Sequence, residues 1–190
     1  MRIKGREYGL RMTVSAAIAV EKVCPKGQIN RIGDVLKGSA EDAVMNICRI
    51  AAALSRGFAE SEAHIGRAAV SATYTEVVGA LADDLFFTDL VSEITETFRN
   101  DFYGTIETRL TKKGREAEKK QKRMKHRTLE QTLPWFLYFG RRHGMSREDV
   151  LNTRFSELQD LMTCDAVYHG LAEEVEKKKK LTQDEMLMLE

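Results

Sequence analysis

The sequence predicts a mainly helical protein of the α+β class, with an N-terminal β-hairpin and helical domain, a basic linker and a small C-terminal helical domain. Only 2 of the 190 residues are proline, and residues that favour helices, namely Ala, Glu, Lys and Leu, are frequent. Apolar residues recur at helical spacing in successive segments. Charge changes abruptly within the chain, which divides it into residues 1–108, 109–127 and 128–190.

The bulk composition narrows the class of protein. With 43% hydrophobic and 31% charged residues, the chain has the composition of a globular protein, and its length fits one domain of about 100 residues plus a smaller one. No stretch approaches the roughly 18 to 20 apolar residues of a membrane span, and charged residues interrupt the N-terminus where a signal peptide would be apolar. We therefore expect a cytoplasmic protein with no membrane partner. The three cysteines do not predict a disulfide framework.

The basic linker is the most unusual stretch. Residues 109–127 hold ten of the 30 Lys and Arg residues and only two acids, whereas residues 1–108 contain twelve bases against fifteen acids and residues 128–190 eight against twelve. Such a run is usually a solvated linker or an exposed charged helix. The alternative is an arm that binds nucleic acid phosphates, although no aromatic residue is interleaved to stack on a base. The cations that would carry this function include Lys112, Lys113, Lys119, Lys120, Lys122 and Arg123.

Residues 1–108 predict a hairpin followed by helices. Alternation at Tyr8, Leu10 and Met12 indicates a strand, with a turn at Lys4 and Gly5. The helical pattern then starts at Thr13 or Ser15 and ends near Cys24, before Pro25. Further helices are expected at residues 29–36, ended by Gly38; from Ser39, a cap with Asp42, to Gly57; at 75–85; and at 88–102, with Leu90, Val91, Ile94, Phe98 and Phe102 facing inward.

Residues 128–190 contain the densest aromatic cluster of the chain. Pro134 fits the first turn of a helix capped by Thr132, and Gly144 is expected to end that helix. The aromatic side chains are a candidate protein-binding surface, and the alternative is that they form core: Trp135, Phe136, Tyr138 and Phe139. Ser146 with Asp149 is expected to start a second helix, and a third carries the stripe Phe155, Leu158, Leu161, Met162 and Ala166. Beyond Gly170 we expect a mobile tail, or one that binds a partner, with Met186, Leu187 and Leu189 in a last turn.

No motif of the sequence requires catalysis. There is no phosphate-binding glycine loop, no HExxH and no CxxC, so we expect no enzyme, no cofactor and no metal. The four histidines are scattered, and Cys164 with His169 lacks the second pair that a zinc site needs. A nucleophilic Cys and His pair assembled by the fold stays open.

Two stretches carry a resemblance to a known family. They are GREYGLRMTVSAAIAVEKVCPKGQINRIGDVLKGS with IAAALSRG (residues 5–39 and 50–57), and LPWFLYFGRRHGMSREDVLNTRFSELQDLM (residues 133–162). The first resembles the N-terminal domain of the tail assembly chaperones of long-tailed bacteriophages of Gram-positive hosts. The second resembles the downstream domain of the same system. The resemblance as a whole extends over about two thirds of the chain, and these stretches carry it most clearly.

The resemblance implies a function without chemistry of its own. In that family, a programmed ribosomal frameshift extends a short protein with a second domain. Members coat the tape measure protein, recruit tail tube subunits through the second domain and leave before the virion is complete. This chain would then be the extended form in the host cytoplasm, with the frame junction at Lys112-Lys113 or Lys119-Lys120. Self-association stays open. The competing hypothesis is a nucleic-acid-binding regulatory protein that uses residues 109–127.

Overall fold

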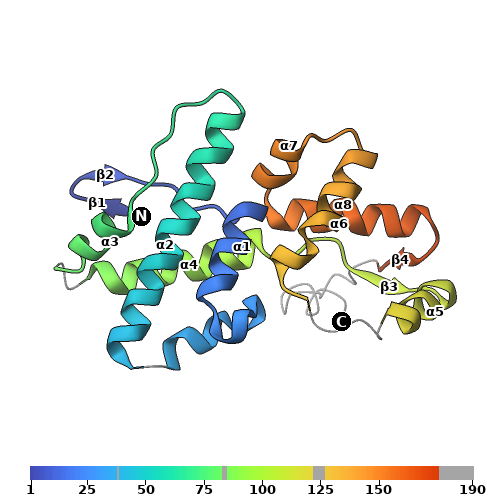
Figure 1. The fold of residues 1–190 in the computed structure, drawn as a ribbon, viewed down its shortest axis with the longest axis horizontal. Coiled ribbons are helices and arrows are strands. Elements are labelled where there is room, and N and C mark those ends of the chain that lie inside the picture. The colour runs from blue at the N-terminus through green and yellow to red at the C-terminus, as the bar shows by residue number, and fades with distance from the viewer. Residues whose placement is uncertain (38, 83–84, 122–126, 176–190) are drawn as a thin grey trace, which may run out of the picture.

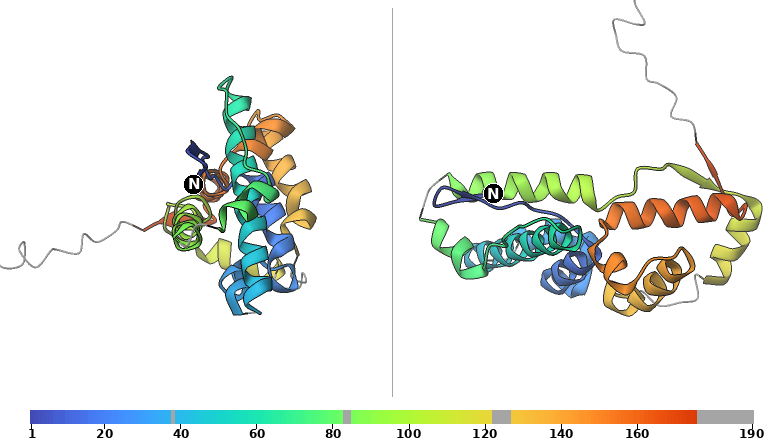
Figure 2. Two further views of the ribbon diagram at one scale, coloured as in Figure 1. Left: turned by 90° about the vertical axis from the view of Figure 1, so that its left-hand side faces the viewer. Right: turned by 90° about the horizontal axis from the view of Figure 1, so that it is seen from above.

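The computed structural model describes residues 1–37, 39–82, 85–121 and 127–175, and these are mainly helical, as the sequence predicts. Figure 1 shows a small N-terminal hairpin beside a group of helices. In the view from above, α4 and α8 lie roughly end to end in one layer, and α1, α2, α6 and α7 form the layer against them (Figure 2). The helices are α1 (Val14–Val23), α2 (Ala40–His64), α3 (Tyr74–Ala80), α4 (Phe86–Asp101), α5 (Lys112–Gln121), α6 (Leu129–Arg142), α7 (Arg147–Asn152) and α8 (Phe155–Tyr168).

The N-terminal hairpin is shorter than the alternating pattern predicts. Strands β1 (Arg2–Ile3) and β2 (Arg6–Glu7) pair in antiparallel fashion around the predicted turn, where Lys4 and Gly5 both have positive φ. The predicted strand through Tyr8, Leu10 and Met12 is wrong. Tyr8 still exchanges backbone hydrogen bonds with Met1 across the hairpin, but beyond it the Arg11 amide bonds to Leu54 of α2 and the Met12 carbonyl oxygen to the Phe155 amide of α8.

The first helix agrees closely with the sequence pattern. The Thr13 hydroxyl caps α1 by accepting a hydrogen bond from the Ala16 amide at 3.2 Å, and α1 ends at Cys24, before Pro25. The next segments are 3₁₀ helices, η1 (Pro25–Gly27) and η2 (Ile29–Lys37), so the predicted short helix exists in a tighter form. Gly38, its predicted end, lies outside the described residues.

Helix α2 begins as predicted and ends later than predicted. The Ser39 hydroxyl accepts a hydrogen bond from the Asp42 amide, which confirms the cap. The prediction that Gly57 closes the helix is wrong, because α2 continues to His64. Gly57 instead allows close packing: a Cβ atom there would lie 2.7 Å from the Arg11 carbonyl oxygen and 2.8 Å from the Ala16 Cβ.

The two helices that follow are close to the predicted ranges. The predicted helix at 75–85 is the shorter α3, which starts at a capping box of Thr73 and Glu76. In α4, Leu90 and Ile94 are buried as predicted, and so is Phe102, just after its end.

The expectation of a simple linker from residue 109 is wrong at its start. Strand β3 (Thr108–Leu110) pairs with β4 (Ala172–Glu174), so the predicted mobile tail begins with an ordered strand. The segment just before β3 is held against α8, because Asp160 accepts hydrogen bonds from the Thr105 and Ile106 amides at 2.7 and 3.0 Å. Helix α5 follows β3. Two of the candidate cations of the basic linker, Lys122 and Arg123, lie outside the described residues, and so does the rest of the predicted tail, residues 176–190.

Helix α6 begins one turn earlier than the sequence suggests. Thr128, not Thr132, is the N-cap, because it forms a reciprocal capping box with Gln131. Pro134 therefore lies inside the helix rather than in its first turn. The predicted end at Gly144 is confirmed by its φ of 77°, and the predicted start at Ser146 and Asp149 is the capping box of α7.

The two flanks of the basic segment share one hydrophobic core. Phe136, Val150, Phe155 and Leu158 belong to the same buried cluster as the apolar residues of α1, α2 and α4. Phe155 stacks on Phe102 with ring centroids 5.2 Å apart. The change of charge at residue 109 therefore marks no break in the core. The stripe predicted on α8 is correct only at its start, because Leu161 and Met162 are exposed.

We predict that Gly57→Ala destabilises the protein by about 1–3 kcal/mol, because the added methyl group overpacks α2 against the chain before α1. Gly79→Ala is the matched control, since Gly79 lies in α3 with no atom within 4 Å of an added Cβ. The control should be neutral or stabilising, because glycine is a poor helix former. Urea unfolding measures both. Equal stability of the Gly57→Ala protein and the original would contradict the close approach.

Candidate protein-binding surface

The position of α6 is fixed by a carboxylate from the other flank. The Leu129 amide at the first turn of α6 donates a hydrogen bond to the Glu21 carboxylate of α1 at 2.6 Å. This amide has no partner within its own helix, so Glu21 satisfies it and lies favourably near the positive end of the helix dipole. Beside it, Lys22 forms an exposed ion pair with Glu130 at 3.0 Å. The start of α6 is thus held against α1.

Burial makes this contact sensitive to pH. Glu21 is only 6% exposed, and burial raises the pKa of its carboxyl group because the charged form loses water. The hydrogen bond from the Leu129 amide favours the charged form and opposes that effect without cancelling it. Glu21 is therefore an acid that holds its proton more tightly in the folded chain than in the unfolded chain.

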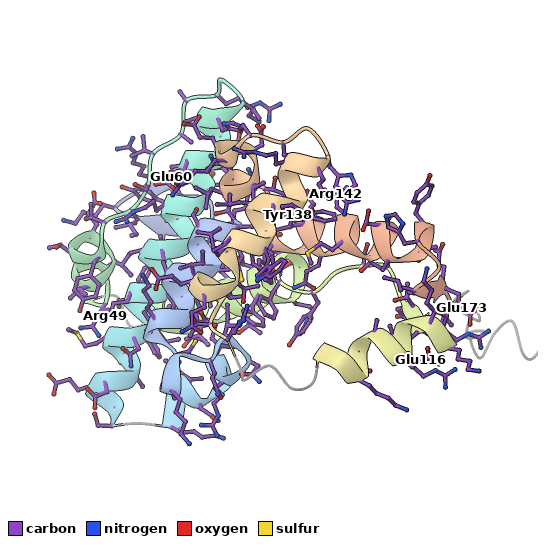
Figure 3. All side chains as sticks on the ribbon, turned by 45° about the vertical axis from the view of Figure 1, so that its right-hand side comes forward. Arg49, Glu60, Glu116, Tyr138, Arg142 and Glu173 are labelled. Atoms are coloured by element: carbon purple, nitrogen blue, oxygen red, sulfur yellow. The ribbon has the colours of Figure 1, made fainter. Side chains whose placement is uncertain are left out.

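The four aromatic residues predicted to bind a partner divide into two pairs. Phe136 is buried, with its ring edge-on to Phe155 at 5.9 Å, and the half-buried Phe139 lies 4.5 Å from the His143 ring. Trp135 and Tyr138 are 57% and 60% exposed. They are three residues apart and so share one face of α6, and Figure 3 shows Tyr138 and Arg142 on the outer side of the helix. One pair is core, and the other is surface.

A groove runs beside this surface, between α6 and α7. The helices approach closely at Gly140, where an added Cβ would clash with the Val150 side chain. The groove has a volume of about 450 Å³. Its lining is apolar and basic: Pro134, Leu137, Tyr138, Arg141, Met145, Ser146 and Arg147. The exposed aromatic residues and the groove together form a candidate protein-binding surface, which we call the α6 surface.

The basic segment is partly engaged with the rest of the protein. Lys113 donates a hydrogen bond to the His169 carbonyl oxygen at 3.0 Å, and Arg109 pairs with Glu173 at 2.9 Å. Lys112 and Lys119 are exposed on α5, and Lys120 belongs to the same helix. In Figure 3, α5, which carries the labelled Glu116, stands apart from the main group of helices. The structure therefore leaves some of the candidate cations accessible.

Two further contacts between ionisable groups support the fold, one between the two flanks and one within residues 1–108. His64 of α2 lies 2.7 Å from Asp149 of α7. Hydrogen bonds from Ser146, and then from His64, lower the pKa of Asp149 to about 2. Arg11 pairs with Glu62 at 2.8 Å, and that contact lowers the pKa of Glu62. Caps and ion pairs explain these groups.

Within the ranges that the structure describes, no three His, Cys, Asp or Glu side chains are grouped so that they could hold a metal ion. Cys24 and Cys48 are buried, and the exposed Cys164 is likewise a free thiol. His169 faces Asp165 at 3.5 Å. None of the described helices is both long enough and apolar enough to cross a membrane.

Comparison with known proteins gives no relative: no family model, no curated protein and no solved structure matches the chain. The fold and the α6 surface define a mainly helical protein in which the described parts of both flanks contribute to one core and an aromatic surface is exposed.

We predict that Glu21→Gln flattens the dependence of stability on pH. Because the pKa of Glu21 is raised above its usual 4.5 by folding, its contribution is complete below that value and is lost as the pH rises through the folded pKa. The difference in unfolding free energy between Glu21→Gln and the original protein should therefore shift in favour of the variant as pH rises from about 4 to 7. Urea unfolding at several pH values measures this, and a difference that is constant with pH would contradict it.

Proposed function

We propose that this protein is a bacteriophage tail assembly chaperone, which binds the tape measure protein and recruits tail tube subunits in the host cytoplasm, and is absent from the mature virion. The observation that carries the proposal is the exposure of Trp135 and Tyr138 on a helix whose opposite face is core. Aromatic side chains held at fixed positions on a rigid helix are typical anchors of protein interfaces. The two segments that resemble the chaperone family support the same function.

The arrangement of the two segments supports a function that links two partners. Helix α1, from the first segment, contacts α6 and α7 from the second, and the Phe155 amide bonds to the Met12 carbonyl oxygen at 2.9 Å. A partner held by residues 5–57 would therefore be held at a defined position relative to the α6 surface. This suits a protein that must bring tube subunits to a tape measure protein.

The size of the α6 surface favours weak and reversible binding. Two exposed rings and a shallow groove offer less surface area for burial than the roughly 800 Å² per partner that a standard stable interface buries. Repeated copies along a long partner would add avidity without making any single contact permanent. An assembly factor that leaves its partners needs this kind of contact.

The frameshift origin belongs to the same proposal. The junction would lie at Lys112-Lys113 or Lys119-Lys120, all within α5. A chain that ended there would lack α6 to α8, which cover part of the shared core. The coding sequence tests this, because a single continuous frame through codons 109–127 contradicts it.

We predict that Trp135→Ala with Tyr138→Ala weakens capture of purified tail tube protein by roughly thirty- to a thousandfold, because interface anchors contribute about 1–2 kcal/mol each. The melting temperature should change little, since both rings are exposed. Tyr168→Ala is the matched control, because Tyr168 is 86% exposed on α8, and it should bind normally. Phe136→Ala should instead lower the stability by about 3–5 kcal/mol. Normal capture by the double variant would contradict the proposal.

The second candidate function is nucleic acid binding through the basic segment, and the exposure of Lys112 and Lys119 on α5 favours it. Against it, Lys113 and Arg109 are already paired within the protein. We predict that gel-shift titrations with DNA and RNA show no binding at physiological salt. Binding that falls steeply with salt and is lost in Lys112→Glu with Lys119→Glu would favour the second function over the first.

A further inference from the structure

The α6–α7 groove differs in charge from other hollows on the described surface. Arg141 and Arg147 line it, and no carboxylate does. Four other hollows each include at least one acidic residue, among them Glu21, Glu62, Glu93 and Glu60. The α6–α7 groove is therefore suited to a segment that carries negative charge.

The remaining lining of the groove favours apolar side chains. Leu137 and Met145 are partly buried and pack against the core, and Pro134 and Tyr138 extend the apolar wall toward solvent. Methionine is flexible and polarisable, so Met145 can adapt to side chains of different shapes. A short apolar run flanked by acids has the composition that this groove would select.

Residues 181–190 of the same chain, LTQDEMLMLE, have this composition. Met186, Leu187, Met188 and Leu189 follow Asp184 and Glu185, and Glu190 comes after them. The preceding Lys177 to Lys180 carry the same charge as the groove, which disfavours residues 177–180 there and favours residues 184–190. These residues lie outside the described part of the chain.

The chain is long enough to reach the groove. Strand β4 follows the C-terminal end of α8, and α7 precedes its N-terminal end, so the two are separated by about the length of α8. Fourteen helical residues span about 21 Å. The nine residue-to-residue steps from Val175 to Asp184 span up to roughly 30 Å when extended. Residues 184–190 can therefore reach α7 and the groove beside it.

We propose that residues 184–190 bind the α6–α7 groove of their own chain, with Asp184 and Glu185 facing Arg141 and Arg147 and the apolar run on Leu137, Tyr138 and Met145. The bound segment covers the α6 surface, and a partner protein must displace it. The surface is then shielded until a partner of higher affinity arrives. This inference does not depend on which protein the partner is.

Trp135 provides the test, because it is the single tryptophan of the chain and adjoins Pro134 on the α6 surface. In the full chain, Asp184→Lys with Glu185→Lys should increase acrylamide quenching of Trp135 and move its emission to longer wavelength. Arg141→Glu with Arg147→Glu should do the same, and the four substitutions together should restore the protected state. Lys112→Glu with Lys119→Glu is the control and should change nothing. Identical quenching in all of these proteins overturns the proposal.

A second measurement separates the chain's own segment from that of another copy. A peptide of residues 181–190, added to the Asp184→Lys with Glu185→Lys protein, should restore protection of Trp135. Its affinity should fall roughly tenfold when both of its acids are replaced, since two exposed charge pairs are lost. Protection in the original chain should be independent of protein concentration. Protection that appears only as dimers form in light scattering overturns binding within one chain.

Discussion

The fold depends on the backbone of residues 11–14, which bonds to both flanks of the basic segment. The Arg11 amide donates to the Leu54 carbonyl oxygen at 3.1 Å, and the Val14 amide donates to that of Thr153 at 3.1 Å. Met12 accepts from the Phe155 amide and donates to Asp101 at 3.0 Å. Met12, Thr13 and Val14 are fully buried, so water cannot replace these partners. Buried backbone hydrogen bonds therefore join the two flanks, in addition to the apolar contacts between them.

This junction determines what each helix of the second flank can expose. Helix α7 packs on α1 and α2, and α8 continues the line of α4, so their inner faces are occupied. Gly140 brings α6 against Val150, which leaves only the outer side of α6 free for a partner. The exposure of Trp135 and Tyr138 is thus a consequence of the way the core is assembled. The helix backbone that carries them is held in place by the core beneath it.

Local sequence patterns predicted most helices and their caps. Features that depend on contacts between distant residues could not be predicted in this way. The turn at Gly5 and the caps at Ser39 and Ser146 were predictable because each involves residues within a few positions. The function of Gly57 was not, because a helix end and a close contact both favour glycine. Pairing of β3 with β4 joins residues more than sixty positions apart, which no local pattern specifies. Helical spacing places Phe139 between Trp135 and Phe136 around α6, so spacing alone does not fix which rings share the exposed face. Packing against Phe155 and Val150 decides which face turns inward.

Glu21 connects these points. Burying a carboxylate costs free energy, as the raised pKa of this one shows, and an apolar residue at the same place would avoid that cost. The carboxylate provides a specific partner for the Leu129 amide, and it does so from the other flank. Adjacent helix residues point about 100° apart, so a rotation of α6 by one residue would bury Trp135 in place of Phe136. The hydrogen bond from the Leu129 amide to Glu21 is directional, so it resists this rotation. Apolar packing resists it less, because the rings of Trp135 and Phe136 are both large and apolar. Glu21 therefore helps determine which pair of rings is exposed, and stability at neutral pH is reduced in exchange for that orientation.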